Sequence, residues 1–513
     1  MIPITPAFRL YARWRRGKLA AQNPVATQEH ELLKLVAHAK NTRFGRDHGF
    51  SSVRSVSDFQ RAVPLRRYEE HWSEYWKSAY PKLVDITWPG TIPFFAVTSG
   101  TTSGASKNIP VTHAMNRANS RGAMDMLLHH LVQRPQSRAA DGKNFFLGGS
   151  VALRKCAPGI YSGDLSGIAV RQTPAWYKPF MFPPAEVAEE PDWGNRIEKI
   201  VELATHTDIR ILGGTPSWLL HFIERQQDRA GAPLTARELY PNLELLVHGG
   251  INFTPYRARF EAFLGGRAET REVYPASEGF IASQDESPEA GLRLMLDNGL
   301  FFEFVPIEEL QSANPTRHTV ADAQTGVNYA IVLSTCAGCW AYVLGDTVRF
   351  VSLDPPRILV TGRTSYFMSA FGEHLIGEEI EDAVVAGAAA IKTTIRDFSL
   401  GAMFSKTPSE SGHHLYIVEF AHYPLEEHKL ARFATALEER LCARNDDYRI
   451  ERNEYGVIGA PEICSVPPGT FASWMKTRGK FGGQNKVPRV INDAELFVNL
   501  EEFARAAIAA ESD

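Results

Sequence analysis

The sequence predicts an α/β protein with a large N-terminal domain, residues 1–368, and a small C-terminal α+β domain, residues 369–513. A chain of 513 residues is too long for one hydrophobic core, so two or more domains are expected. From about Trp88 onward, short apolar runs alternate with glycine-rich turns and helical segments, which is typical of a sheet covered by helices. After residue 370 a helix, a strand and a second helix follow one another, enough for a separate small domain.

The first ninety residues are expected to be helical. In HELLKLVAHA (30–39) the apolar residues recur at helical spacing, and RSVSDFQRAV (54–63) opens with serines that are typical helix caps. The strand-and-helix pattern then appears in three segments, NFFLGGS (144–150), IRILGGTPSWLLHFIERQ (209–226) and LELLVHGG (243–250). Together they predict an α/β sheet.

The sequence pattern changes after residue 290, where strand-like segments follow one another. Asp297-Asn298-Gly299 stands between two strand-like runs in LRLMLDNGLFFEFVP, which predicts a β-hairpin. Antiparallel strands are expected at NYAIVLST, DTVRFVSL and RILVTGR. In the small domain a helix is expected at GEEIEDAVVAGAAA, a strand at HHLYIVEFA and an amphipathic helix at LEEHKLARFATALEERL.

Composition excludes several classes of function. Apolar residues make up 44% and charged residues 22% of the chain, as in an ordinary globular protein. The net charge is −4 and no long basic block is present, so nucleic acid is not expected as a partner. Five irregularly spaced cysteines do not form a disulfide framework and favour a reducing, cytoplasmic location.

The N-terminal stretch MIPITPAFRLYARWRRGKLAAQ is rich in arginine. Its apolar residues are interrupted by arginines, so it lacks the apolar core of a signal peptide. No stretch reaches the roughly 18–20 apolar residues of a membrane span. The helix could touch an anionic membrane or resemble a transit peptide, but an amphipathic helix that packs on the body of the protein is favoured. No membrane partner is expected.

The stretch 97–110, VTSGTTSGASKNIP, has the residue types that hold phosphate. Glycines allow close approach, hydroxyls and bare N–H groups donate hydrogen bonds, and a lysine supplies charge. The Walker pattern requires a lysine directly after its second glycine, whereas here Gly104 is followed by Ala105 and Ser106. The residues expected to contact phosphate are Thr98, Ser99, Gly100, Thr101, Thr102, Ser103 and Lys107.

This loop resembles the phosphate loop of adenylate-forming enzymes, the superfamily of acyl-CoA synthetases, luciferases and peptide-synthetase adenylation domains. The segment REVYPASEGF (271–280) resembles a second motif of that superfamily. By this resemblance Tyr274 would lie against adenine, Ser277 would meet a phosphate and Glu278 would hold Mg²⁺. Nucleotide contacts are also implied at Gly250 and Ala276.

A third segment, CAGCWAYVLGDTVRF (336–350), places Asp346 like the aspartate that accepts hydrogen bonds from the ribose hydroxyls. Its Cys336 and Cys339 suggest a zinc or redox site by their spacing. However, no second pair of Cys or His residues with ligand spacing lies nearby. Buried structural thiols are therefore expected.

Two further segments resemble the moving parts of these enzymes. ILVTGRTSYFMSAFGEHLIGEEIEDAV (358–384) resembles the hinge between their two domains, so Arg363 would reach ribose or phosphate and the chain after Thr364 would let the small domain rotate. RGKFGGQNKVPRV (478–490) would carry Lys486 on a mobile loop. Adenylation needs such a charge, because the carboxylate and the α-phosphate meet in the transition state.

The segments in chain order resemble the Gretchen Hagen auxin-responsive family of acyl-acid amido synthetases. The resemblance rests on TRFGRDHGF, SVSDFQRAVPLRRYEEHW, TSGTTSGASKNIP, GLFFEFVP, CAGCWAYVLGD and GQNKVPR, and runs from about residue 25 to 495. It implies a two-domain adenylate-forming fold with a β-barrel-like subdomain and a mobile C-terminal domain. It also implies that Mg-ATP activates a small aryl, indolyl or fatty acid, whose acyl group is then transferred to an amino acid. Glu278, Lys107 and Lys486 would be the catalytic residues.

The acid pocket is the least defined part of this resemblance. Candidates for its lining are Met126, Leu127, His130, Gly149 and Ser150, although core packing explains the first two as well. Ala276, Ala341 and Val343 depart from the family pattern and weaken any transfer of plant-hormone substrates. An acyl-CoA ligase with a thiol acceptor and a catalytically silent nucleotide-binding protein remain alternatives. A monomer or weak homodimer is expected.

Overall fold

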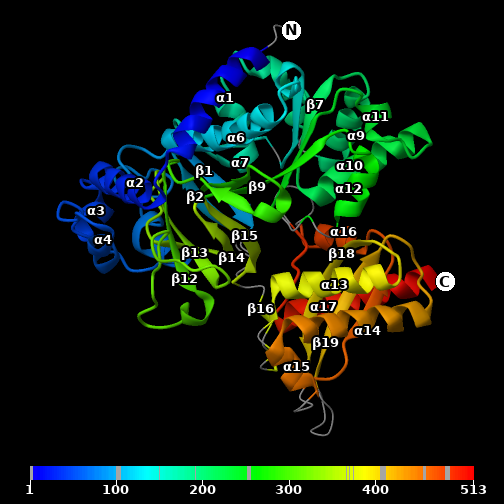
Figure 1. Ribbon diagram of the computed structural model, residues 1–513. Helices are drawn as coiled ribbons and strands as arrows, with labels where there is room; N and C mark the ends of the chain where they lie inside the picture. Colours follow the sequence, from blue (N-terminus) through cyan, green and yellow to red (C-terminus); the bar gives the residue numbers. More distant parts are fainter. Residues whose placement is uncertain are drawn as a thin grey trace. The chain divides into compact units, whose positions relative to one another are not determined.

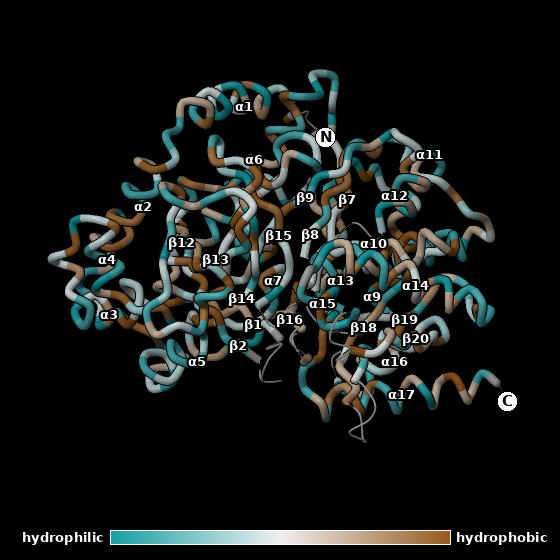
Figure 2. Tube along the Cα trace, turned by 60° about the horizontal axis from the view of Figure 1, so that its bottom comes forward, coloured by the Kyte–Doolittle hydropathy of each residue, from teal (hydrophilic) through white to brown (hydrophobic). Residues whose placement is uncertain are grey.

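Eleven strands between residues 143 and 363 form one large sheet in the computed structural model of the protein (Figure 1 and Figure 2). The structure describes residues 4–99, 106–149, 151–190, 192–250, 253, 256–364, 367–368, 370–371, 373, 375–404, 412–453, 458–479 and 486–512. The chain forms two units, Met1–Asn252 with Arg259–Val360, and Phe253–Ala258 with Thr361–Asp513. The first is a large α/β unit and the second a smaller α+β unit, the class that the sequence predicts. The boundary at 368/369 and the mobility of the small domain stay predictions.

Helices begin the large unit, as expected. They are α1 (Thr5–Ala20), α2 (Pro24–Ala39), α3 (Arg43–Asp47), α4 (Val56–Ala62), α5 (Tyr68–His71) and the π-helical turn η1 (Trp72–Trp76). The side chain of Ser55 accepts a hydrogen bond from the backbone N–H of Asp58, so the predicted serine cap starts α4. In α2 the apolar positions Leu32, Leu35 and Val36 are buried on one face, which follows from the helical period.

The main sheet has a parallel and an antiparallel half. Strands β3 (Lys143–Leu147), β6 (Met181–Phe182), β7 (Ile209–Gly214), β8 (Leu245–Gly249) and β9 (Glu269–Ala276) are parallel. The rest of the sheet consists of β10 (Gly279–Gln284), β11 (Leu292–Leu294), β12 (Leu300–Pro306), β13 (Asn328–Thr335), β14 (Tyr342–Leu353) and β15 (Pro356–Arg363). The strand order is β12-β13-β14-β15-β11-β10-β9-β8-β7-β3-β6. The antiparallel strands, where a barrel-like subdomain was expected, therefore join the parallel strands in one continuous sheet.

A second, four-stranded sheet carries the glycine-rich segment. Its order is β2-β1-β5-β4, formed by β1 (Phe94–Ser99), β2 (Ser106–Val111), β4 (Arg154–Ala157) and β5 (Ile160–Gly163). The other helices of the large unit are α6 (His113–Gln133), α7 (Leu165–Gln172), α8 (Ala185–Ala188), α9 (Trp193–Ala204), α10 (Pro216–Ala230), α11 (Ala236–Leu239) and, from Arg259 onward, α12 (Arg257–Leu264). Short 3₁₀ turns stand at Ala139–Asp141, Lys178–Phe180, Pro288–Ala290 and Ile307–Glu309.

Helix α6 covers one face of the parallel half. Met126 and Leu131 of this helix share a buried cluster with Ile211, Leu245 and Val247 of strands β7 and β8. Successive strand residues point to opposite faces, and Leu212 and Leu246 are fully buried as well. Burial on both faces explains why these strands are continuous apolar runs.

The predicted hairpin at 297–299 is wrong. β11 pairs with β10 and β15, and β12 pairs with β13, so the two strands that flank the turn do not pair with each other. Gly299 does adopt a positive φ of 73°, as the turn signal requires. The side chains of the turn bind elsewhere: Asp297 pairs with Arg15, and Asn298 donates to a carbonyl of α6. Tertiary contacts hold this turn instead of a cross-strand ladder.

The small unit is a three-stranded sheet between two helical layers. Its strands are β18 (Ile395–Met403), β19 (His413–Phe420) and β20 (Glu462–Val466), and a further pair is β16 (Phe367–Met368) with β17 (Leu375–Ile376). Its helices are α13 (Gly377–Ala390), α14 (Glu427–Arg444), α15 (Asp446–Asn453), α16 (Thr470–Thr477) and α17 (Ala494–Ser512). Tyr416 and Val418 share a cluster with α13 and α14, whereas Leu415 and Ile417 share one with α16 and α17. The strand and both helices expected here are confirmed.

Candidate functional site

The turn between β9 and β10 carries the segment in which the sequence predicts metal and nucleotide contacts. Ala276 pairs with Gly279 across the turn, so Ser277 and Glu278 form its tip. Ser277 is half-buried and Glu278 is buried, with 7% of its surface exposed. The strand leading into this turn is parallel to β8, so the turn lies at the carboxyl edge of the parallel half, where open α/β sheets bind ligands.

Two glycines lie at the same edge. Gly149 follows the end of β3 and is buried. Gly250 follows β8, is exposed and has a φ of +85°, a backbone conformation that favours glycine. The strand register places Leu147 opposite Gly214, and Gly249 opposite Val273. Ser150 lies outside the described residues, so its predicted acid contact stays a prediction.

The β1–β2 hairpin presents Lys107 beside a short helix. Thr98 and Lys107 are cross-strand partners in the antiparallel register. The Lys107 Nζ lies 3.7 Å from Glu69 Oε1 and 5.2 Å from the centre of the Tyr68 ring, both on α5. The loop between the strands is outside the described residues, which include neither Gly100, Thr101, Thr102, Ser103 nor the side chain of Ser99.

Strand β14 brings two side chains to the β9–β10 turn. The hydroxyl of Tyr274 donates a hydrogen bond of 2.6 Å to Asp346 Oδ2. Four residues before Asp346, the hydroxyl of Tyr342 donates a hydrogen bond to Glu278. The predicted adenine contact and the predicted ribose contact are therefore joined directly, and a tyrosine holds the predicted metal ligand.

Burial dominates the electrostatics of Glu278. It raises the pKa of this carboxyl group, the nearby negative charge of Asp346 raises it further, and the positive charge of Lys107 acts in the opposite direction. Burial and the charge of Glu278 likewise raise the pKa of Tyr342 well above its usual value. Glu278 is thus a buried carboxylate that its protein neighbours do not fully compensate.

These residues fit a magnesium ion that arrives with ATP. Mg²⁺ in nucleotide sites is held by one or two carboxylates together with phosphate oxygens and water. Glu278 keeps acceptor positions beyond the one that Tyr342 uses, because an ionised carboxylate has about four. Within the described residues no group of three or more His, Cys, Asp or Glu side chains could hold a metal.

The CxxC pair lies in the interior of the same unit. Cys336 and Cys339 are buried free thiols, and burial raises the pKa of both, to about 12 for Cys336. A thiol is a weak nucleophile and a weak metal ligand until it loses its proton. Both residues are therefore suited to packing.

Two predicted site residues belong to the small unit. Arg363 is the last residue of β15 and is half-buried. Lys486 is exposed and follows residues 480–485, which lie outside the described part of the chain. Just beyond it, Arg489 is buried among Asp397 and Tyr256, so the segment after Lys486 is anchored in its own unit.

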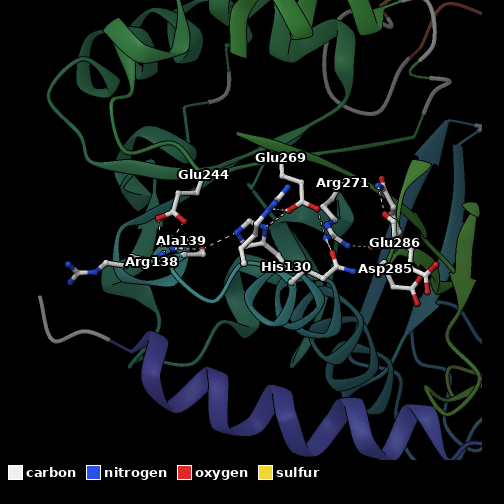
Figure 3. Close-up of polar contacts among 12 residues, drawn as sticks. His130, Arg138, Ala139, Glu244, Glu269, Arg271, Asp285 and Glu286 are labelled. Atoms are coloured by element: carbon white, nitrogen blue, oxygen red, sulfur yellow. Dashed lines mark hydrogen bonds and ion pairs between the residues drawn. The ribbon is translucent and has the colours of Figure 1, made fainter. Parts of the chain in front are cut away.

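The candidates for the acid pocket on α6 are all buried. Met126 and Leu127 pack in the cluster beneath the helix. Figure 3 shows Glu269 between His130 and Arg271. His130 Nδ1 lies 2.9 Å from a Glu269 carboxylate oxygen, and its Nε2 lies 3.0 Å from the Ser137 hydroxyl.

The contact between His130 and Glu269 lies at the end of β9 opposite to the β9–β10 turn. Glu269 begins β9 and Ala276 ends it, so about 23 Å of strand separates the two ends. A pocket of about 410 Å³ opens beside this contact, lined by Gln133, Arg134, Glu269, Thr270, Gln284, Glu286, Ser287 and Pro288. The position of His130 at this end does not favour its predicted contact with the acid, which stays a prediction.

Three family models match the chain. The N-terminal domain of the GH3 family matches residues 15–212, its central domain residues 293–363 and its C-terminal domain residues 378–495. The chain belongs to the GH3 family. This confirms the resemblance that its motifs indicate.

Curated GH3 relatives are named as amido synthetases. The indole-3-acetic acid-amido synthetase GH3.4 of Arabidopsis thaliana is 21% identical over 92% of this chain and 90% of its own. GH3.3 of the same plant is 24% identical, and the jasmonoyl-L-amino acid synthetase JAR4 of Nicotiana attenuata is 26% identical. The chain spans about half the length of these two relatives, 44% and 46%.

Solved structures show the same fold. The GH3 chain matches the AtGH3.15 acyl acid amido synthetase in complex with 2,4-DB with a TM-score of 0.77, at 19% identity, over 94% of each chain. It matches a 2-hydroxyisobutyryl-CoA ligase in the postadenylation state with a TM-score of 0.62, at 16% identity, over 95% of this chain and 93% of the other. The fold is thus that of adenylate-forming enzymes.

Two contacts of this GH3 site were not expected from the sequence. Neither Tyr342 nor the α5 residues Glu69 and Tyr68 were predicted as site residues. The sequence contains no local signal for Tyr342, because a register shift between Val343 and Thr347 interrupts the regular alternation of β14. Glu69 gives no such signal, since its contact joins segments far apart in the chain.

Proposed function

We propose that this GH3 protein is an ATP-dependent acyl-acid amido synthetase. The observation that carries the proposal is the convergence of Lys107, Glu278 and Asp346 at the carboxyl edge of the sheet, with Tyr274 bonded to Asp346. These residues come from three separate segments, and each matches a position that the family resemblance assigns to nucleotide or metal. The fold shared with adenylate-forming enzymes supports the same reaction.

In the proposed site each side chain has a defined role. Tyr274 lies against adenine while its hydroxyl orients Asp346, whose carboxylate accepts hydrogen bonds from the ribose hydroxyls. Glu278 holds Mg²⁺, which when bound neutralises the phosphates. Lys107 and the 98–103 loop hold the phosphates that leave. Tyr342 keeps the Glu278 carboxylate aimed at the site.

The proposed reaction has two steps. A carboxylate oxygen of the acid attacks the α-phosphorus, and pyrophosphate leaves to give an acyl-adenylate. The neutral amine of an amino acid then attacks the acyl carbon, AMP leaves, and the nitrogen gives up a proton to form the amide. No protein nucleophile is needed, so the residues act by positioning and by stabilising charge. Lys486 serves the first step, and rotation near residues 364–371 opens the site for the second.

The substrate classes are proposed more broadly. The acid is a small aryl, indolyl or fatty acid and the acceptor an amino acid, as the names of the curated relatives suggest for indole-3-acetic acid and jasmonate. An acyl-CoA ligase activity is the second candidate, favoured by the structural match to a CoA ligase. A cytoplasmic location fits the five free cysteines and belongs to the same proposal.

The experiment that tests adenylation is ATP–pyrophosphate exchange over a panel of aryl, indolyl and fatty acids, with Glu278→Ala as the control. We expect exchange with at least one acid and its loss in the variant. Absence of any Mg-ATP-dependent rise in melting temperature would overturn the assignment of the nucleotide site. Binding without exchange for every acid would favour a silent nucleotide-binding protein.

A second measurement with the same acid identifies the acceptor of the acyl group. AMP release is followed with twenty amino acids or with coenzyme A, and the product is identified by mass. An amide supports the synthetase and a thioester supports the ligase.

A further inference from the structure

Helix α1 exposes an apolar stripe on its outer side. Leu10 is 74% exposed, Trp14 59% and Tyr11 38%, although large apolar side chains are usually buried. At 100° per residue, Leu10 and Trp14 lie within 40° of each other on the helix surface. Tyr11 and Trp14 are in contact, with ring centres 5.4 Å apart.

The inner side of α1 is already fixed to the large unit. Ala12, Arg15 and Leu19 are buried, and Arg15 forms ion pairs with Asp125 of α6 and with Asp297. In Figure 3, α1 lies on the outer side of α6. The exposed stripe is therefore the side opposite to the one by which the helix is docked.

Basic residues flank the stripe. Helix α1 contains Arg9, Arg13, Arg15, Arg16 and Lys18 and no acidic residue, in a chain whose net charge is −4. Arg13, Arg16 and Lys18 are exposed. The Lys18 Nζ lies 5.8 Å from the centre of the Trp14 ring, so charge and aromatic surface adjoin directly.

We propose that the outer face of α1 binds the surface of an anionic phospholipid bilayer. Helices that lie in the interface plane combine Trp, Leu or Phe on one side with Lys and Arg beside them, and Trp and Tyr favour the headgroup region. Only one side of α1 is available, which suits a flat surface better than a protein groove that encloses a helix. Within the described residues no helix is long and apolar enough to cross a membrane. The contact is peripheral, and it departs from the expectation that no membrane is a partner.

The test is flotation of the full-length protein with vesicles of phosphatidylcholine, with and without phosphatidylglycerol. We expect binding only to the anionic vesicles and its loss at high salt, because the basic residues act through screened charge. Trp14→Ala should weaken binding about tenfold. Trp176→Ala is the matched control, since Trp176 is 58% exposed and also pairs with a tyrosine at 5.4 Å.

A second pair of variants tests the charge. Arg13→Glu with Lys18→Glu should weaken binding at least about fivefold for each residue. Arg229→Glu with Arg237→Glu makes the same change in net charge on exposed residues outside α1 and should leave binding unchanged. Trp14 should also be quenched by brominated lipid, seen as the difference between the wild type and Trp14→Phe.

Three results would overturn the proposal. They are failure of the wild type to float with anionic vesicles at low salt, equal binding to neutral vesicles, and equal loss in the two tryptophan variants. Far-ultraviolet circular dichroism of each variant shows whether weaker binding comes from the substituted side chains or from unfolding. The proposal does not depend on the enzymatic function, so pyrophosphate exchange without lipid should be unchanged in every α1 variant.

Discussion

At the residue scale, the metal-binding role proposed for Glu278 conflicts with the stability of the fold. Its folded-state pKa is raised above 4.5 by burial, so the folded protein holds this proton more tightly than the unfolded chain does. The stability that the residue contributes is therefore present at low pH and is lost as pH rises through its raised pKa. Glu278→Gln removes that charge and keeps an acceptor for Tyr342. We expect it to raise the melting temperature at neutral pH and to abolish pyrophosphate exchange.

Thermal unfolding followed across pH checks this expectation. The gain in melting temperature should disappear below the pH range in which a glutamate side chain ordinarily titrates, because the carboxyl group is then neutral in both the folded and the unfolded state. Glu29→Gln, at an exposed glutamate, is the control and should change nothing. A lower melting temperature for Glu278→Gln at neutral pH would mean that its neighbours compensate the buried charge after all.

At the element scale, the end of β8 has no room for a side chain. A Cβ on Gly249 would lie 2.2 Å from the carbonyl oxygen of Val273 on β9, so something in the backbone would have to shift. Gly249→Ala should lower the free energy of unfolding. It should also weaken nucleotide binding, because the next residue, Gly250, is a predicted nucleotide contact. Gly17→Ala is the matched change on the exposed face of α1, where nothing lies within 4 Å. It should stabilise by about 0.5–1 kcal/mol.

Urea denaturation of both glycine variants measures the difference. Equal effects would show that helix and strand propensity, not the contact with Val273, governs the cost at Gly249.

Docking of α1 depends on one buried cation. Arg15 is 3% exposed and pairs with Asp125, which is 1% exposed, and with Asp297. Arg15→Met leaves the buried carboxylate of Asp125 without its partner, and we expect a loss of about 3–5 kcal/mol in urea denaturation. Arg61→Ala breaks an exposed pair with Asp58 and should cost about 1 kcal/mol or less. Similar losses for the two variants would contradict the buried-pair argument.

At the scale of the whole molecule, the proposed reaction needs groups from both units. Lys486→Ala should lower pyrophosphate exchange by at least about a hundredfold, because it removes a charge that stabilises the transition state. The rise in melting temperature with Mg-ATP should persist, since the proposed nucleotide-binding residues of the large unit remain. Lys476→Ala, an exposed lysine of the same unit, is the control. Loss of Mg-ATP binding in Lys486→Ala would place this lysine in ground-state binding instead.

The sequence predicted the elements with strong local signals. Strand β19 and helix α13 could be located because their apolar pattern or caps are encoded within a few residues. The turn at 297–299 shows the limit of such signals. Gly299 has the positive φ that the turn signal predicts, yet the two strands beside it pair with other strands. Contacts of the turn with α1 and α6 hold it in place of hydrogen bonds between those two strands.

What the sequence by itself determined was the class of the fold, the order of its elements and the motifs of the proposed nucleotide site, since periodicity and motif spacing are local properties. Only the tertiary structure decided that Tyr342 bonds to Glu278, that Lys107 adjoins Glu69, and that His130 lies at the far end of β9. Such contacts join residues far apart in the chain, and strand order and register, which no single segment encodes, bring them together.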